Sequence, residues 1–493
     1  MLSLLAKICI HCENSCMVFS SLVFLYIFLP FVLLGLSVCK KIPYQNTFLF
    51  LASLLFYSWG GVRYTFILLI SILLNWVFGL GIAKYKGHKK LFLTASVLVN
   101  LSILVFYKYT NFFIDNVNVL MSCFRLNSIT VTEIVLPIGI SFYTFQGISY
   151  VIDVYRETVS PQKNFLKLGT YISLFPQLIA GPIIRYKELE SQLSERAFSL
   201  DNLYEGLKLF IIGLARKVLI ANQLAIVADA IFSRAPETLG LLPAWLGIIC
   251  YTLQIYYDFA GYSDMAIGLG RMFGFSFPEN FNFPYIAKSI KEFWRRWHMT
   301  LSAWFKDYLY IPLGGNRCSK HRLYFNLYVV FFCTGFWHGA SWNFIVWGLW
   351  HGTFLVIERI GLGNWLERRT VIFQHVYALL VVMIGWVFFR AENLDYAVEY
   401  LKSMFWIRKA EIPNFFLLEY ATIYNSVILC IAIVCATPIV ASINTKIKEK
   451  SLKNSCTCSI RYSVIAIFVL IVMILATNYL INGGYNPFIY FRF

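Results

Sequence analysis

Long apolar stretches recur along this chain and constrain its fold more than any other feature. Examples are Met17–Leu36, Tyr64–Ala83 and Val371–Phe389. The hydrocarbon core of a bilayer takes about 20 apolar residues in a helix, and inside it the backbone must satisfy its own hydrogen bonds. Only 14% of the residues are charged, against about 25% in soluble domains. We therefore expect an all-α polytopic membrane protein.

Proline and glycine interrupt several of the apolar stretches. They stand near Pro137, near Pro176 and between Gly261 and Gly274. Broken helices are tolerated at membrane depth where they are buried in protein or line a cavity. We expect about eleven transmembrane helices, with re-entrant and interfacial helices, around a central funnel or tunnel. Residues 17 to 493 should form a single membrane domain. Residues 1 to 16 are interpreted as an N-terminal extension, with Met17 as an alternative start.

The positive charge of the chain lies beside its apolar stretches. The formal net charge is +17, with cations at Lys40–Lys41, Lys84–Lys90 and Lys446–Lys453. Such cations set topology and meet lipid headgroups, so we expect no nucleic-acid partner. The first two loops are two spans apart and share a side, which the positive-inside rule places in the cytoplasm. The N-terminus then faces outward.

The sequence gives no support to metal, nucleotide or disulfide chemistry. Its 12 cysteines are scattered, many of them inside apolar runs, and no second pair has zinc-finger spacing. It has no glycine-rich dinucleotide motif after a strand, no P-loop and no His-Glu-x-x-His motif. We expect no bound metal.

His338 lies near the centre of the apolar run from Leu327 to Leu349. An ionisable side chain is costly there, and such residues usually have a function. Imidazole has an unperturbed pKa near neutrality, so His338 is a candidate general base. The alternative is a neutral imidazole that is hydrogen-bonded to a neighbouring helix.

Small and polar residues surround His338 in the sequence. Gly335 and Gly339 would let another helix approach closely. The polar neighbours either orient the imidazole or satisfy helix backbone. These neighbours are Thr334, Ser341 and Asn343.

A second histidine, His298, follows a stretch of alternating charges. Trp294, Trp297 and His298 fall at i, i+3 and i+4, a pattern typical of an interfacial amphipathic helix. The segment is either an anchor at headgroup level or the mouth of a tunnel that His298 lines. The cations on and after this segment that would meet an anionic ligand are Arg295, Arg296, Lys306 and Arg317.

Four further residues have weaker signals. Asp258 and Asp264 are carboxylates in an apolar block, where each either orients an imidazole or makes a structural hydrogen bond. Ser141 is a hydroxyl that would serve a covalent mechanism. His351, in a second Trp-His-Gly, lies near a span end, which favours a structural role.

Five sequence blocks, in this order, resemble the membrane-bound O-acyltransferase family, in its bacterial branch of alginate O-acetylation and teichoic acid D-alanylation. The resemblance covers about Met17 to Phe389. It implies that His338 matches the family's invariant histidine and His298 a second polar position. The blocks are Pro137–Gln146, Phe175–Arg185, Tyr257–Arg271, Phe293–Arg317 and Thr334–Asn343.

The resemblance further implies an enzyme that moves acetyl from acetyl-coenzyme A across the bacterial inner membrane for O-acetylation of an extracytoplasmic polysaccharide. The donor is a substrate, and no bound cofactor is expected. Its phosphates would meet the four cations Arg295, Arg296, Lys306 and Arg317. The expected partner is an extracytoplasmic acyltransferase or a small acceptor protein. Alternatives are transfer of D-alanyl or another small acyl group to a cell-wall polymer, and a non-catalytic transporter or scaffold of a glycan export complex.

Overall fold

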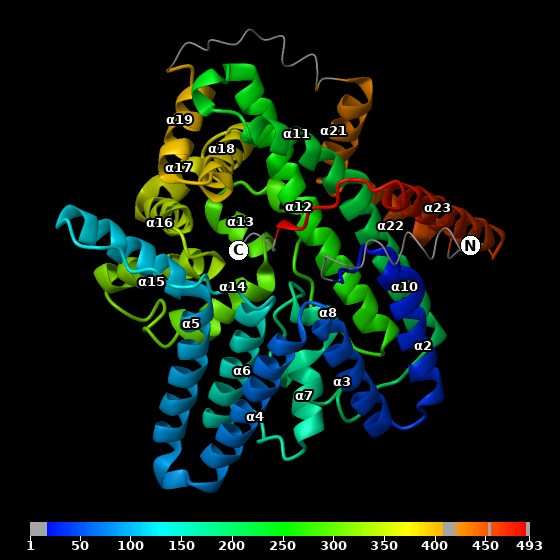
Figure 1. Ribbon diagram of the computed structural model, residues 1–493. Coiled ribbons are helices and arrows are strands. Elements are labelled where there is room, and N and C mark those ends of the chain that lie inside the picture. Colours follow the sequence, from blue (N-terminus) through cyan, green and yellow to red (C-terminus); the bar gives the residue numbers. More distant parts are fainter. Residues whose placement is uncertain (1–16, 408–419, 421, 452–454, 490–493) are drawn as a thin grey trace. The chain divides into compact units, whose positions relative to one another are not determined.

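The structure, a computed structural model, describes residues 17–407, 420, 422–451 and 455–489 (Figure 1). The expected N-terminal extension, 1–16, lies outside the described residues. The described chain is helical and has no strand. It divides into two compact units. Unit 1 consists of Met1–Leu207 and Ala266–Pro278, and unit 2 of Lys208–Met265 and Glu279–Phe493. A single domain from 17 to 493 stays a prediction.

Unit 1 is a bundle of helices that packs through aromatic and amide side chains. Phe24 and Phe56 lie in a buried phenylalanine cluster with Phe175. Asn75 of α4 and Asn100 of α5 exchange amide hydrogen bonds at 3.0 and 3.1 Å. The elements are η1 (Phe24–Phe28), α2 (Leu29–Val38), α3 (Ile42–Ser58), α4 (Val62–Lys84), η2 (Lys86–His88), α5 (Lys89–Cys123), α6 (Ile140–Tyr155), α7 (Phe165–Ser173), α8 (Phe175–Leu178) and α9 (Tyr186–Leu189).

Two of the three predicted helix breaks are confirmed, both in unit 1. Gly139, before α6, has a φ of +74°, and a Cβ there would lie 2.4 Å from the Leu178 carbonyl oxygen. Leu174 separates α7 from α8, just before Pro176. The third prediction, a break between Gly261 and Gly274, is wrong, because α12 (Leu241–Met272) is unbroken from Gly261 to its end at Met272. Gly274, with a φ of +83°, lies beyond that end.

Unit 2 contains most of the remaining helices, several of them short or of π type. Helices α10 (Leu200–Ala215) and α12 each have residues in both units. The other elements are η3 (Arg216–Ala221), α11 (Asn222–Phe232), η4 (Pro236–Thr238), η5 (Pro284–Ile286), α13 (Ile290–Arg296), α14 (Met299–Phe305), η6 (Lys306–Tyr310), α15 (Lys320–His338), α16 (Trp342–Ile357), η7 (Glu358–Leu362), α17 (Gly363–Glu367), α18 (Val371–Arg390), α19 (Leu394–Met404), α21 (Ile423–Cys435), α22 (Ile439–Ser451) and α23 (Ser455–Ile481).

Several helices are long and apolar enough to cross a membrane, so the predicted all-α polytopic fold is confirmed. Among the described residues there are 5, or up to 6 if the bent pair Ile423–Cys435 and Ile439–Glu449 is one span. The count of eleven stays a prediction. In unit 1, the α2–α3 and α4–α5 turns, which carry the lysines used to assign topology, lie at the same end (Figure 1).

Candidate functional site

His338 lies at the corner of a helical hairpin in unit 2. The apolar run from Leu327 to Leu349 is divided between two helices: α15 ends at His338, and α16 begins at Trp342. A Cβ on Gly335 would lie 2.2 Å from the Phe344 carbonyl oxygen, and the ring of Phe344 covers Gly339. The two glycines therefore permit the close helix approach that was predicted, and this approach holds His338 at the corner.

Aromatic rings surround the His338 side chain, which is 6% exposed. The centres of the Trp347 and Phe389 rings lie 5.0 and 5.4 Å from the centre of the imidazole ring. A small pocket of about 10 Å³, room for about one water molecule, opens beside the imidazole. We call it the small pocket; its lining is Ile255, Phe259, Trp297, His338, Trp347, Trp386, Phe389 and Ile489.

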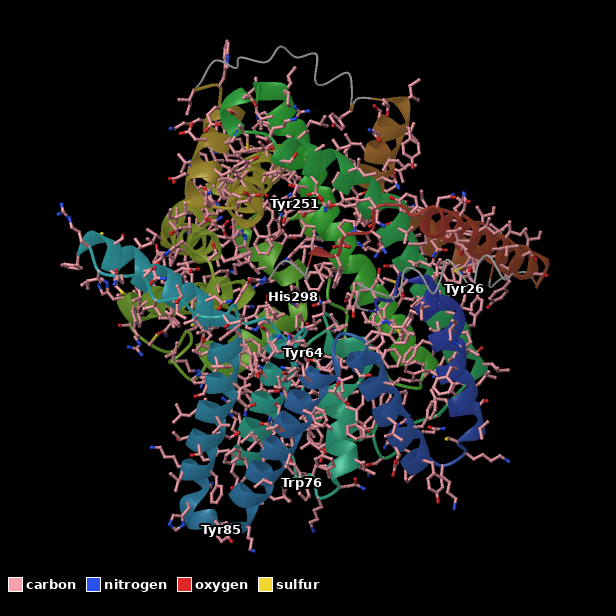
Figure 2. All side chains as sticks on the ribbon, in the orientation of Figure 1. Tyr26, Tyr64, Trp76, Tyr85, Tyr251 and His298 are labelled. Atoms are coloured by element: carbon pink, nitrogen blue, oxygen red, sulfur yellow. The ribbon has the colours of Figure 1, made fainter. Side chains whose placement is uncertain are left out.

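His298 lies at a break between two short helices and not on a continuous amphipathic helix. Helix α13 ends at Arg296, α14 begins at Met299, and His298 has a φ of +42°. That left-handed conformation is strained for a residue with a Cβ, and such strain gathers at functional sites. His298 and Trp297 are 1% and 3% exposed, so neither is a headgroup anchor (Figure 2).

Asn280 fixes the proton position on His298. The Oδ1 atom of Asn280 accepts hydrogen bonds from the backbone N–H and the hydroxyl of Thr300, at 3.2 and 2.9 Å. Because this atom is an acceptor, the Nδ1 of His298, 3.0 Å away, must carry the proton. Burial lowers the pKa of His298 to about 3. The ring is therefore neutral near pH 7, and its Nε2 keeps a lone pair with no hydrogen-bond partner among the described residues.

The two histidines belong to one aromatic cluster. Trp337 lies against both, with ring centres 6.4 Å from His298 and 5.0 Å from His338. Phe259, which lines the small pocket, lies edge-on to His298 at 4.7 Å. The structure thus brings together two histidines that are 40 positions apart in the sequence.

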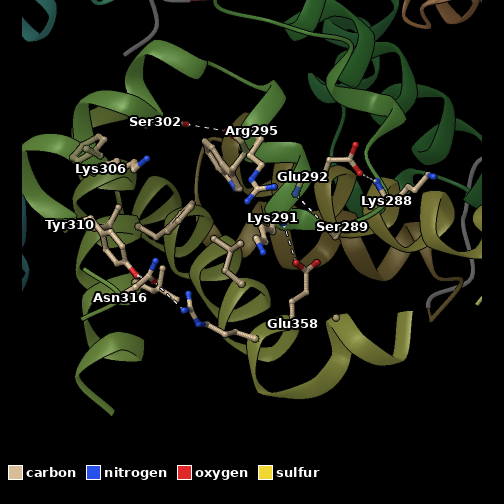
Figure 3. A pocket seen from close by; sticks show the side chains of 18 of the residues that line it. Lys288, Ser289, Lys291, Glu292, Arg295, Ser302, Lys306, Tyr310, Asn316 and Glu358 are labelled. Atoms are coloured by element: carbon tan, nitrogen blue, oxygen red, sulfur yellow. Dashed lines mark hydrogen bonds between the residues drawn. The ribbon is translucent and has the colours of Figure 1, made fainter. Parts of the chain in front are cut away.

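A much larger pocket, of about 820 Å³, lies beside α13 (Figure 3). Its volume is within the range of about 300 to 1,000 Å³ that ligand sites have. Of the four cations predicted to bind the donor, Arg295 and Lys306 line this pocket, and neither has an ion-pair partner among the described residues. Arg296, paired with Glu292, and Arg317 are not in its lining. We call it the large pocket. Lys288 and Lys291, which belong to the charged segment before His298, also line it, and so does Arg359, which the sequence did not indicate.

Carboxylates fix the position of α13 at the edge of the large pocket. Glu358 of η7 accepts hydrogen bonds from the backbone N–H groups of Ile290 and Lys291, at 2.6 and 3.1 Å (Figure 3). Burial raises the pKa of Glu358, and the two N–H donors oppose this effect. Glu292 accepts from the backbone N–H of Lys288 at 2.9 Å. Both carboxylates therefore accept hydrogen bonds from the backbone of the segment whose side chains include the cations of the pocket.

Asp258 pairs with a buried lysine that the sequence did not single out. Lys217 Nζ lies 2.6 Å from the carboxylate, and both side chains are almost fully buried. Lys217 also donates to the Pro487 carbonyl, and the backbone N–H of Ile489 donates to Asp258 at 2.8 Å. This pair therefore binds the segment Tyr485–Ile489, which contributes Ile489 to the small pocket.

The other predicted polar residues mostly bond to backbone. Thr334 donates to the Val330 carbonyl, Ser341 caps α16, and Asn343 donates to the Ala391 carbonyl at 2.7 Å. Asp264 pairs with Arg216 of η3. Groups of three or more His, Cys, Asp or Glu side chains that would hold a metal ion are absent from the described part of the chain.

Ser141 belongs to unit 1, whereas His338 belongs to unit 2. Its side chain is buried on α6, and its Oγ accepts a hydrogen bond from the Nζ of Lys108 at 3.3 Å. A serine beside a lysine is an arrangement that some acyl-transfer enzymes use.

The model of the membrane-bound O-acyltransferase family matches residues 159–391. The probable alginate O-acetylase AlgI of Azotobacter vinelandii is 46% identical over 394 residues, covering 79% of this chain and 78% of that protein. The peptidoglycan O-acetyltransferase of Helicobacter pylori is 39% identical over 425 residues, covering 79% and 80%. The teichoic acid D-alanyltransferase of Bacillus subtilis is 32% identical over 230 residues, covering 44% and 58%.

The chain belongs to the membrane-bound O-acyltransferase family and is a multi-pass membrane O-acyltransferase. Both His298 and His338, and every residue that lines the large pocket, fall within the matched residues. Ser141 and Ile489 fall outside them.

Proposed function

We propose that this enzyme transfers an acetyl group from acetyl-coenzyme A to a hydroxyl, for O-acetylation of a cell-envelope polysaccharide, with His338 as the general base. The single observation that carries the proposal is the placement of His338 in the small pocket, at the corner of the α15–α16 hairpin. The identity to alginate and peptidoglycan O-acetylating proteins supports the acetyl group and the polysaccharide.

The proposed chemistry starts from the imidazole of His338 in a pocket lined by apolar and aromatic side chains. His338 takes the proton of the acceptor hydroxyl while the hydroxyl oxygen attacks the thioester carbonyl carbon. The C–S bond then breaks, the ester forms, and the leaving thiolate receives the proton from the imidazolium. Since His338 is the last residue of α15, the carbonyl groups at that helix end favour the imidazolium that forms during attack. The lone pair on His298 Nε2 makes this residue a second acceptor in the same aromatic cluster.

The large pocket is the proposed site for the phosphates of the donor. Arginine and lysine side chains bind phosphate through charge-assisted hydrogen bonds. Arg295 and Lys306 are free of ion pairs within the described residues, and two carboxylates of the lining, Glu292 and Glu358, accept hydrogen bonds from backbone N–H groups. With the lysine-rich turns of unit 1 in the cytoplasm, we place the N-terminus outside and the enzyme in the bacterial inner membrane.

A comparison of two histidine variants tests the catalytic assignment. His338→Ala should lower the rate by about 10² to 10⁴, the usual effect of losing a general base. His321→Ala, at the exposed start of the same helix, is the matched control and should keep the wild-type rate. A folded His338→Ala protein with full activity would overturn the proposal. If the wild-type enzyme transfers D-alanyl from its thioester but does not transfer acetyl from acetyl-coenzyme A, the alternative acyl group is supported.

We also propose direct transfer, without an acyl-enzyme at Ser141. The enzyme is incubated with labelled acetyl-coenzyme A and no acceptor, then denatured and analysed by mass spectrometry. We expect no acetyl group on Ser141, and an acetyl-Ser141 peptide would refute direct transfer.

The last part of the proposal is an extracytoplasmic acyltransferase or small acceptor protein that works with this enzyme. Most described residues lie in helices or short connections, which leaves little surface for gripping a polymer. Purified enzyme in liposomes, with acetyl-coenzyme A inside and polysaccharide outside, should acetylate poorly alone. Efficient acetylation with no second protein would contradict the partner.

A further inference from the structure

Three helices of unit 2 each contribute to both the large and the small pocket. A residue of each helix lines the large pocket, and another, three to eight positions away, lines the small pocket. These pairs are Trp294 of α13 and Trp297 directly after it, Thr334 and His338 on α15, and Leu355 and Trp347 on α16. The two pockets are therefore successive spaces along the same helices, with packed side chains between them.

Three rings fill the space between the two pockets. Trp294 lines the large pocket, Trp347 lines the small one, and their ring centres are 5.8 Å apart. His351 of α16 lies against both, at 5.2 Å from Trp294 and 5.3 Å from Trp347. Trp347 and His351 are 0% exposed and Trp294 is 8% exposed. We call these three residues the Trp–His barrier.

The barrier has polar atoms that purely structural packing does not require. The indole Nε1 atoms of Trp294 and Trp347 and both ring nitrogens of His351 are buried, with no hydrogen-bond partner among the described residues. Buried polar atoms are nearly always paired, so four in one cluster need an explanation. Apolar side chains would pack here without leaving buried polar atoms unpaired.

We propose that the Trp–His barrier binds the amide groups of the pantetheine arm of the thioester donor on its way to His338. This inference rests on the proposed function. The arm carries amides along its length, and each offers a carbonyl oxygen and an N–H group. The indole N–H groups donate to the carbonyl oxygens, and the neutral imidazole of His351 donates to one amide and accepts from another. To admit the arm, the rings move apart and their nitrogens gain partners.

Donors that differ in their arms distinguish this role from simple packing. Trp294→Phe, Trp347→Phe and His351→Phe are tested with acetyl-coenzyme A, with acetyl-pantetheine, which lacks the terminal phosphates, and with S-acetyl-mercaptoethanol, which has no amide. Loss of a hydrogen bond to an amide should lower kcat/KM about tenfold more for the two amide-bearing donors than for the amide-free donor. His351→Gln, which keeps a donor and an acceptor, should recover most of the loss.

Trp76→Phe is the matched control. Trp76 of α4, in unit 1, also has a buried Nε1 atom without a partner among the described residues, but it lines neither pocket. The Trp76→Phe variant should leave kcat/KM unchanged for every donor.

An acetylated carrier protein, whose phosphopantetheine has the same amides, replaces acetyl-coenzyme A in a parallel series. The comparison of the two series shows which donor supplies the pantetheine arm.

The outcomes separate this inference from the proposed function. Absence of acyl transfer by the wild-type enzyme with every donor would refute the proposed function. Wild-type activity combined with equal losses for all three donors, or with no loss, would overturn amide binding by the barrier. If one tryptophan variant does not fold, the other tryptophan variant and His351→Gln give the same comparison.

Discussion

Asn280 should control the chemistry of His298 although it does not line either pocket. Replacing it with alanine removes the acceptor of three hydrogen bonds, from His298 Nδ1, the Thr300 backbone N–H and the Thr300 hydroxyl. At about 1 kcal/mol for each, the free energy of unfolding should fall by about 3 kcal/mol. The proton of His298 is then no longer held on Nδ1, and we expect a loss of about 10² in kcat, at the low end for a general acid or base.

Asn280→Asp gives the complementary result. Its carboxylate still accepts from His298 and Thr300, so the protein should stay folded. The added negative charge should raise the pKa of His298 from its value of about 3. The acidic limb of the pH–rate profile should therefore move to higher pH.

Both variants are measured in detergent micelles, by chemical denaturation for stability and by acetyl transfer at several pH values for kcat. Wild-type kcat in a folded Asn280→Ala protein would refute a role for the His298 tautomer. An unshifted pH–rate profile for Asn280→Asp would show that His298 does not titrate in the rate-limiting step.

Three further predictions concern packing, charge and pH. Gly335→Ala places a Cβ 2.2 Å from the Phe344 carbonyl oxygen; it should cost about 1 to 3 kcal/mol of stability, and an unchanged thermal midpoint would contradict the close approach. Lys217→Met leaves Asp258 buried without its cation and should cost about 3 to 5 kcal/mol; adding Asp258→Asn should restore part of this, and no restoration would argue against the pair. For His298, a folded pKa of about 3 against an ordinary 6.5 means that the unfolded chain binds a proton that the folded protein does not. Stability should therefore fall by about 1.4 kcal/mol from about pH 7.5 to about pH 5.5, and His298→Gln should abolish this part of the fall.

The sequence predicted the elements whose signals are local. Apolar runs predicted the helical membrane fold, Pro137 and Pro176 marked real breaks, and Gly335 indicated a close helix contact. The ion pair of Glu292 with Arg296 follows from i, i+4 spacing. Each of these depends on residues within a few positions of one another.

The features that sequence reasoning missed depend on residues far apart in the chain. The tautomer of His298 is fixed by Asn280, 18 positions away, and the carboxylate of Asp258 is neutralised by Lys217 on another helix. The expectation of one amphipathic helix through His298 failed because a repeat of charges and tryptophans does not reveal a left-handed residue. The glycines of α12 indicated a break, but Gly261 serves a close contact between two helices. It packs against Gly213 of α10, and α12 is unbroken at this position.

The α15–α16 hairpin has a consequence for the order in which the site forms. Its two helices are joined by only Gly339, Ala340 and Ser341, so their contacts are short-range in sequence, and short-range contacts form early because little chain entropy is lost in closing them. We expect the hairpin to enter the membrane as one unit during synthesis, with His338 already at its corner. Asn280 and α13 precede it in the chain, while α18 and Ile489 follow. The surroundings of the imidazole are therefore completed only once Ile489 has been made.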